Sequence, residues 1–152
     1  MFSVLTQQRV ADINKGIRVN KAANTTPLAS ADLYHIYVGR VLMTLFIGEI
    51  TTVIGAGATT IQIVSNPTVG LAINLSGAGT DLASDAVGVQ MGLTGTAADN
   101  MLHGQALAPM QANAVVLSVG HLSVVYGAGT AGAIKYSLWY VPLDAGAYVA
   151  AV

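Results

Sequence analysis

The chain has 152 residues, of which 53% are hydrophobic and only 9% are charged. Its length is typical of one domain with a substantial core, and the absence of cysteine excludes disulfides and thiolate metal sites. Globular domains usually carry about 25% charged residues, so much of this surface is expected to be buried in an assembly or in a membrane.

The first 31 residues are predicted to form an extended N-terminal arm, followed by a β domain over residues 32–152. Residues 1–31 have no strong hydrophobic period, although a short helix over 3–15 is an alternative. Nothing in residues 1–9 resembles a signal peptide, because no apolar block follows a basic start. A solvated, frayed terminus is the simpler alternative to an arm.

Charge is unevenly placed along the chain. Residues 1–40 carry a net charge of +3 and residues 41–152 a net charge of −4. The cations of the arm are Arg9, Lys15, Arg18 and Lys21. They have no interleaved aromatic residues and so fall short of a nucleic-acid signature. We therefore predict that the arm docks on an acidic patch of a partner protein and makes no direct contact with nucleic acid.

The first half of the domain is predicted to be a meander of two hairpins. Its aromatic and β-branched runs are residues 33–38, 41–47, 49–54 and 59–64, with glycine-containing turns at 39–40 and 55–57. Residues 41–64 are the most apolar stretch, but Glu49, five threonines and three glycines do not suit a membrane-spanning helix. We expect burial in an assembly, with no membrane contact.

The remaining elements are predicted in the same way. The pattern indicates strands over 70–76 and 87–93, one helical turn over 80–86 capped by Thr80, and an irregular loop over 94–112. Further strands are expected over 114–119, 122–126, 133–141 and 148–150, with a tight turn at Gly120-His121 and a stop at Pro142. About nine short strands predict an all-β fold, either a β-sandwich or a jelly-roll-like barrel.

No motif predicts catalysis or cofactor binding. Gly127, Gly129 and Gly132 match the spacing of a dinucleotide fingerprint, but a strand follows them instead of a helix. The nearest acid, Asp144, comes only twelve residues after Gly132, so a flexible turn is the better interpretation. There is no Gly-x-Ser-x-Gly elbow, and we predict that the protein is not an enzyme.

No metal site is predicted either. The three histidines, His35, His103 and His121, lack metal-ligand spacing, and a packing role is expected for His35 and a loop position for the others. Asp81, Asp85 and Asp99 are interpreted as cap and loop acids in preference to ligands of a hard cation.

Three runs carry a resemblance to a known group of proteins. Residues 38–54 read VGRVLMTLFIGEITTVI, residues 66–70 read NPTVG, and residues 131–147 read AGAIKYSLWYVPLDAGA. In these runs the chain resembles a family of small virion proteins encoded in the structural modules of tailed bacteriophages. The resemblance covers most of residues 33–152 and leaves the arm unmatched.

The resemblance implies a structural protein of the virion, of the capsid decoration (cement) type. Such proteins are often β-rich trimers that sit where neighbouring capsomers meet. This implies a homo-oligomer, a trimer, made in the host cytoplasm and bound to the major capsid protein on the capsid exterior. It would bridge capsid subunits and strengthen the shell, and self-contacts around a three-fold axis would be heterologous and ring-closing.

Seven residues are the expected contacts. Arg9, Lys15, Arg18 and Lys21 would dock the arm, and Tyr37, Phe46 and Trp139 are the expected apolar anchors, although such residues are also typical of a core. A tail, baseplate or head-fibre component is one alternative, and a carbohydrate-binding β-sandwich module displayed on the particle is another. The sequence leaves open the strand order, the oligomer number, the partner surface, the host and any bound ion.

Overall fold

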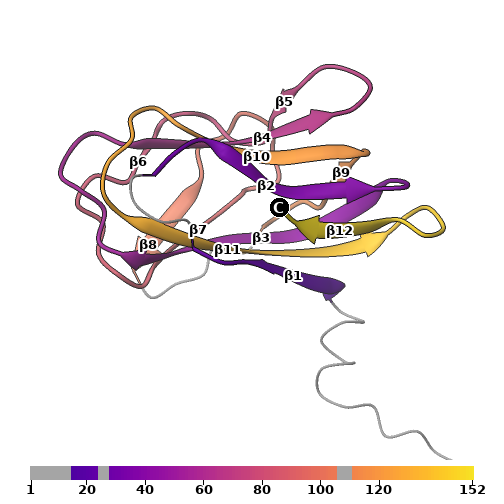
Figure 1. The fold of residues 1–152 in the computed structure, drawn as a ribbon, viewed down its shortest axis with the longest axis horizontal. Coiled ribbons are helices and arrows are strands. Elements are labelled where there is room, and N and C mark those ends of the chain that lie inside the picture. Colours follow the sequence, from indigo (N-terminus) through magenta and orange to yellow (C-terminus); the bar gives the residue numbers. More distant parts are fainter. Residues whose placement is uncertain (1–14, 24–27, 106–110) are drawn as a thin grey trace, which may run out of the picture.

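A computed structural model describes residues 15–23, 28–105 and 111–152, and these residues form a β-sandwich (Figure 1). Its two antiparallel sheets each have six strands. Sheet I has the order β1-β11-β3-β7-β8, with β9 also paired to β3, and sheet II has the order β12-β2-β10-β4-β5, with β6 also paired to β4. The predicted β-sandwich is confirmed.

The strand bounds are as follows. Sheet I contains β1 Ile17–Lys21, β3 Val41–Thr52, β7 Val89–Gly92, β8 Leu102–Gln105, β9 Val115–Leu117 and β11 Ala133–Pro142. Sheet II contains β2 Ala31–Tyr37, β4 Thr60–Pro67, β5 Ile73–Asn74, β6 Thr80–Asp81, β10 Gly120–Tyr126 and β12 Tyr148–Ala151.

One hydrophobic core lies between the sheets. In β11 the inward side chains Ile134, Tyr136, Leu138 and Tyr140 are buried, while the alternate residues face outward, as their period of two predicts. Strand β3 supplies the long partner of β11, and Gly48 lies in its middle. A Cβ on Gly48 would come within 2.9 Å of Met91 Cγ, so the glycine leaves room for this close approach. The sequence predicts two strands, over 41–47 and 49–54, but β3 runs through Gly48 without a break.

The predicted meander is wrong. Strands β2 and β4 belong to sheet II and β3 to sheet I, so the turns at 39–40 and 55–57 cross between the sheets. Among the described strands, only β4–β5 and β7–β8 are consecutive in the chain and hydrogen-bonded to each other. Each amphipathic strand thereby turns its apolar face toward the preceding strand across the core instead of pairing with it edge to edge.

Several local predictions also change. The expected helical turn begins as the short strand β6, and only two residues of the expected strand 70–76 pair, as β5. The expected loop 94–112 contains β8, and Gly120 starts β10 instead of closing a hairpin with β9. His103 and His121 therefore lie on strands and not in loops.

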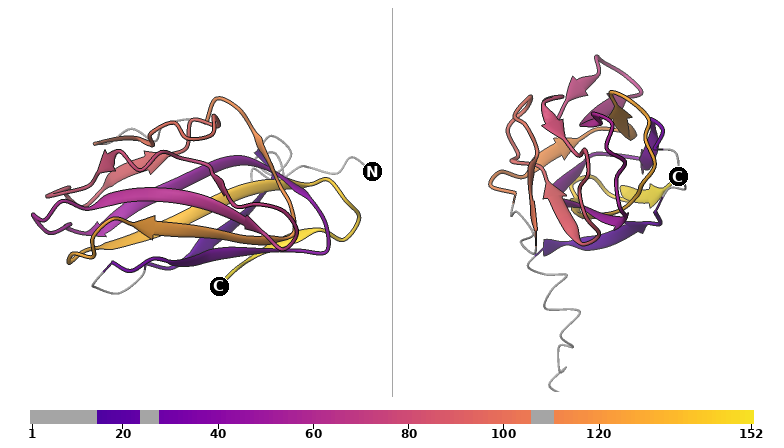
Figure 2. Two further views of the ribbon diagram at one scale, coloured as in Figure 1. Left: turned by 90° about the horizontal axis from the view of Figure 1, so that it is seen from above. Right: turned by 90° about the vertical axis from the view of Figure 1, so that its left-hand side faces the viewer.

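The boundary of the arm also differs from the expected one. Residues 17–21 form β1, an edge strand of sheet I paired to β11, and Leu28 is part of the core. The expected helix over 3–15 falls almost entirely outside the described residues. Arg18 and Lys21 therefore belong to the sandwich itself. The two sheets pack face to face in both views of Figure 2.

Candidate functional site

The outer face of sheet I brings together two of the residues that the sequence singled out. Arg18 on β1 lies directly opposite Trp139 on β11, and its guanidinium carbon is 4.9 Å from the centre of the indole ring. Its Nη2 donates to Ser137 Oγ at 3.1 Å, and that hydroxyl donates to Asn20 Oδ1 at 2.8 Å. Two neighbouring strands thus hold the Arg18 side chain in place over the ring.

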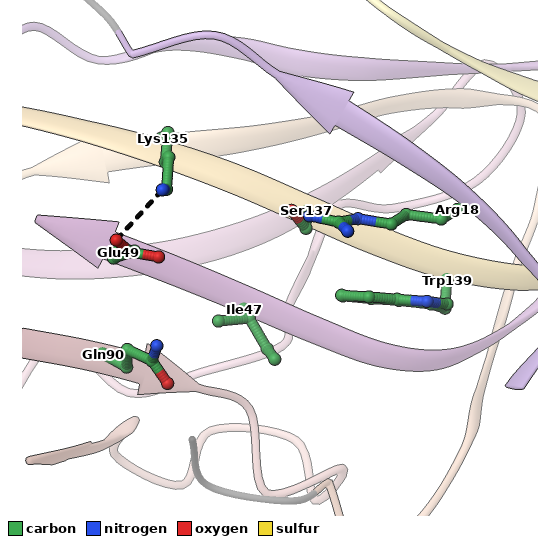
Figure 3. Close-up of a pocket in the computed structure, with 7 residues that line it drawn as sticks. All are labelled: Arg18, Ile47, Glu49, Gln90, Lys135, Ser137 and Trp139. Carbon is green, nitrogen blue, oxygen red and sulfur yellow. Dashed lines mark hydrogen bonds and ion pairs between the residues drawn. The ribbon is translucent and has the colours of Figure 1, made fainter. Parts of the chain in front are cut away.

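Beside this stacked pair is a hollow of about 220 Å³ (Figure 3). The residues that line it, called the Arg–Trp hollow below, are Arg18, Ile47, Glu49, Gln90, Lys135, Ser137 and Trp139. Lys135 Nζ lies 3.0 Å from Glu49 Oε1 across the β11–β3 pair. This ion pair was not predictable from the sequence, because the two residues are far apart in the chain and no local pattern shows that their strands pair.

The chemistry of the Arg–Trp hollow suits binding. The Ser137 hydroxyl is engaged by Arg18 and Asn20, and neither of these is a general base. Arginine and tryptophan are among the residues most enriched at the energetic centres of protein interfaces. The hollow is open and lies on a sheet face, so it offers a contact surface for a protruding group of a partner.

Trp139 is the only tryptophan of the chain, so its fluorescence reports on this hollow. Arg18→Ala removes the cation from above the ring and exposes the indole to water. We expect the emission maximum of Trp139 to move to longer wavelength in this variant, while the free energy of unfolding falls by about 1 kcal/mol or less. Arg18→Lys is the matched control, and an unchanged spectrum in Arg18→Ala would contradict the stacking.

A second candidate surface lies at one end of the sandwich, where the turns β2–β3, β4–β5, β9–β10 and β11–β12 gather (Figure 1, right). We call it the loop end. Thr68 N donates to Val119 O at 2.8 Å, which joins two of these turns. The loop end exposes four large apolar side chains: Val38 (70%), Val69 (88%), Leu71 (87%) and Leu143 (46%). Each of these four residues stands next to a glycine or a proline in the sequence, which was the available signal for an exposed apolar turn.

An ion pair fixes the centre of the loop end. Asp144 accepts hydrogen bonds from Arg40 Nε at 3.0 Å, Nη2 at 2.9 Å and the backbone N at 2.7 Å. Arg40 and Asp144 line a cleft of about 430 Å³ together with Val69 and Val119. Val38, next to the pair, has a φ of 69°, an uncommon conformation for a β-branched residue.

The ion pair gives the loop end a defined pH dependence. Hydrogen bonds from the Arg40 side chain, then from its backbone, lower the pKa of Asp144 from 3.8 to about 2. Because the folded-state value is depressed, the stabilisation is present above pH 4 and is lost as the pH falls toward 2. We expect the difference in Tm between wild type and Asp144→Asn to be constant above pH 5 and to vanish near pH 2.

Carboxyl NMR checks this assignment directly. The carbon resonance of Asp144 should titrate near pH 2 in the wild type, and Arg40→Gln should move that midpoint part of the way back, because the backbone hydrogen bond remains. An ordinary midpoint in the wild type would contradict the ion pair.

The other predicted contact residues are scattered. Phe46 is completely buried in the core, so its expected role as an interface anchor is wrong. Lys15 precedes β1, and Lys21 is the last residue of that strand, where its Nζ donates to the carbonyl oxygen of Val152. Arg9 lies outside the described residues. Tyr37 is half-buried on the outer face of sheet II.

Tyr37 belongs to an aromatic row that crosses sheet II. Its ring stacks on Tyr148 at 4.8 Å and on His35 at 3.9 Å, and His35 stacks on His121 at 4.2 Å. Asp32 continues the row, because its Oδ2 lies 3.2 Å from His121 Nδ1. No local pattern groups these residues, and the pairing of β12, β2 and β10 places them side by side.

Nowhere in the described ranges do three or more His, Asp or Glu side chains come together in a way that would hold a metal ion. Across the same residues, no helix is long and apolar enough to cross a membrane.

The comparisons with known proteins found no match: no family model, no curated protein and no solved structure resembles the chain closely enough to be reported. The three runs that carry the expected resemblance lie on strands and turns of both sheets. In the structure, residues 38–54 and 131–147 contain the paired strands β3 and β11, and residues 66–70 cover the end of β4 and the start of the β4–β5 turn. All three runs contribute residues to the loop end.

Proposed function

We propose that this chain is a structural protein of a virus particle, which assembles with copies of itself and decorates a bacteriophage capsid. The observation that carries the proposal is the loop end, where four large apolar side chains are exposed on turns. A large exposed apolar patch on a soluble monomer marks a place of contact, and these four side chains lie on turns at the same end of the sandwich. With only 9% charged residues in the chain, further surface is available for burial in an assembly.

The proposed mechanism is the bridging of capsid subunits. The loop end would seat on the shell, burying Val69 and Leu71, the two most exposed apolar side chains of this surface. Specific interfaces typically bury about 1,600 Å² in total, and linked copies engage the shell with an effective affinity above that of one copy. A homotrimer, which the resemblance implies, would tie several capsid subunits together from the capsid exterior.

The rigidity of the sandwich supports this mechanism. The turns of the loop end are held by the Arg40–Asp144 pair and by the Thr68–Val119 hydrogen bond. A surface that is ordered before binding loses less conformational entropy when it docks. A decoration protein that resists outward pressure requires such a preformed surface.

The experiment uses particles that lack this chain. We expect them to release their DNA at a lower temperature than complete particles, and we expect the purified protein to bind them and restore the higher temperature. Particles whose heat resistance is unchanged without the chain, and which do not bind it when it is added, would overturn the proposal.

One observation favours a second candidate, a carbohydrate-binding module displayed on the particle. The aromatic row of sheet II has polar neighbours, since Ser123 Oγ donates to Asp32 Oδ1 at 2.5 Å and Asn66 Nδ2 donates to Ser123 Oγ at 2.8 Å. Aromatic rings with adjacent hydrogen-bonding groups suit the apolar faces and hydroxyls of sugars. Binding to a glycan array that Tyr148→Ala abolishes would support this candidate, and an array without signal would remove it.

A further inference from the structure

Four of the five lysine and arginine residues that the structure describes gather on one side of the sandwich. Lys15, Arg18 and Lys21 lie on or next to β1, and Lys135 lies on the neighbouring strand β11. These four residues are called the basic edge, and Glu49 forms an ion pair with one of them, Lys135. The fifth described cation, Arg40, is paired with Asp144 at the loop end. The basic edge therefore carries a net positive charge.

The opposite side of the sandwich is acidic. β1 and β8 are the two ends of sheet I, and β6 lies on the side of sheet II away from β12. Thr80 Oγ1 donates to Met101 O at 3.2 Å, which joins the β6 and β8 sides of the two sheets. Asp81, Asp85 and Asp99 lie on or beside these strands and are called the acidic edge.

The acidic edge is anionic at neutral pH. Hydrogen bonds from the backbone N–H groups of Thr59 and Ala83 lower the pKa of Asp81. Burial raises the pKa of Asp85, and His103, whose Nε2 lies 3.6 Å from Asp85 Oδ2, opposes that shift. Opposite net charges therefore lie on opposite sides of one small domain.

We propose that the basic edge binds the acidic edge of a second copy of this chain. The inference rests on the proposed function, since it names the surfaces through which the proposed homo-oligomer forms. The partner is a second copy of this chain because the charges of the two edges are complementary. On the basic edge, the Arg–Trp hollow is the place where a side chain of the second copy would bind. The guanidinium group of Arg18 has five N–H donors, and the contact with Ser137 uses one of them. The remaining donors can bind a carboxylate.

This arrangement determines the kind of symmetry. The two edges are different surfaces of the same chain, so their contact is heterologous. A heterologous contact between successive copies closes into a ring when the rotation between copies is a simple fraction of a turn. The turns of the loop end lie at one end of the strands, whereas the two edges run along the sides of the sheets, so both contacts can form in one assembly (Figures 1 and 2).

The test is a charge swap followed by sedimentation velocity on the full chain. Arg18→Glu and Asp99→Arg are each expected to raise the dissociation constant of the oligomer at least about tenfold, because each places like charges across the contact. The double variant restores opposite charges in every contact of a ring and is expected to recover most of the association. The wild-type oligomer should also weaken as salt rises to about 0.5 M.

Val125→Glu, which adds a charge on the outer face of sheet II, is the control and should associate like the wild type. Circular dichroism confirms that each variant is folded. An oligomer that resists salt and both single reversals would overturn this inference and leave the proposed function standing. A double variant weaker than either single variant would also overturn it. A wild-type chain that stays monomeric would contradict self-assembly in the proposed function as well.

Discussion

Phe46→Ala is expected to lower the free energy of unfolding by about 3–5 kcal/mol, the range for removing a buried aromatic ring from a core. Phe46 has no exposed surface, and its ring centre lies 5.7 Å from that of Tyr136 on the paired strand. The alanine leaves a cavity that the flanking strands β3 and β11 fill only in part. Chemical denaturation of the wild type and the variant measures the loss.

The same variant separates a core role from a contact role. A domain of this size is stable by about 5–15 kcal/mol, so Phe46→Ala should remain folded at low temperature and should associate normally there. Phe46→Leu is the control and should lose clearly less stability. A variant with unchanged stability and lost association would show that Phe46 acts at an interface.

Leu71→Asp is expected to have the largest effect on docking to the shell. Leu71 is 87% exposed in the β4–β5 turn, so the folded chain loses almost nothing when it is replaced. In a docked complex the aspartate would bury an unpaired charge where an apolar side chain had been, a change that costs several kcal/mol. We expect incorporation into particles to fall at least about a hundredfold in competition with the wild-type chain.

The control for Leu71→Asp is Val125→Asp. Val125 is also an exposed apolar residue, but it lies on the outer face of sheet II and not at the loop end. It should enter particles as the wild-type chain does. If both variants enter equally well, the loop end does not face the shell; if both fail, docking uses more of the surface than the loop end.

The strand content of the fold was predictable because β-strands leave a local signal. In β11 the alternation of Ile134, Tyr136, Leu138 and Tyr140 with outward residues has a period of two, and burial follows it. The glycine-rich turns separated most strands correctly. These features depend only on residues close together in the chain.

The pairing of the strands was not predictable in the same way. A short turn such as Gly39-Arg40 joins two strands either as a hairpin or as a crossing between sheets, and composition does not separate the two outcomes. The side chains that decide between them, such as Phe46 against Tyr136, are about ninety residues apart. Short strands such as β8 depend on a neighbour for their hydrogen bonds and leave little pattern of their own.

Which residues share a candidate surface was likewise not predictable from the sequence. Arg18 and Trp139 were each singled out from the sequence, but their stacking follows from the register of β1 on β11. The pairing of Lys135 with Glu49 and the meeting of Val69 with Arg40 at one cleft depend in the same way on tertiary structure. Sequence reasoning identified residue types suited to contact, and the topology decides which of them share a surface.

The copy number of this chain in purified particles, relative to the major shell protein, tests the central claim most directly. Quantitative mass spectrometry of intact particles supplies the ratio. A decoration protein that bridges capsid subunits should be present at a ratio near one to one, or at a fixed simple fraction of it. A few copies per particle would place the chain in the tail or at a vertex, and its absence from particles would contradict a virion role altogether.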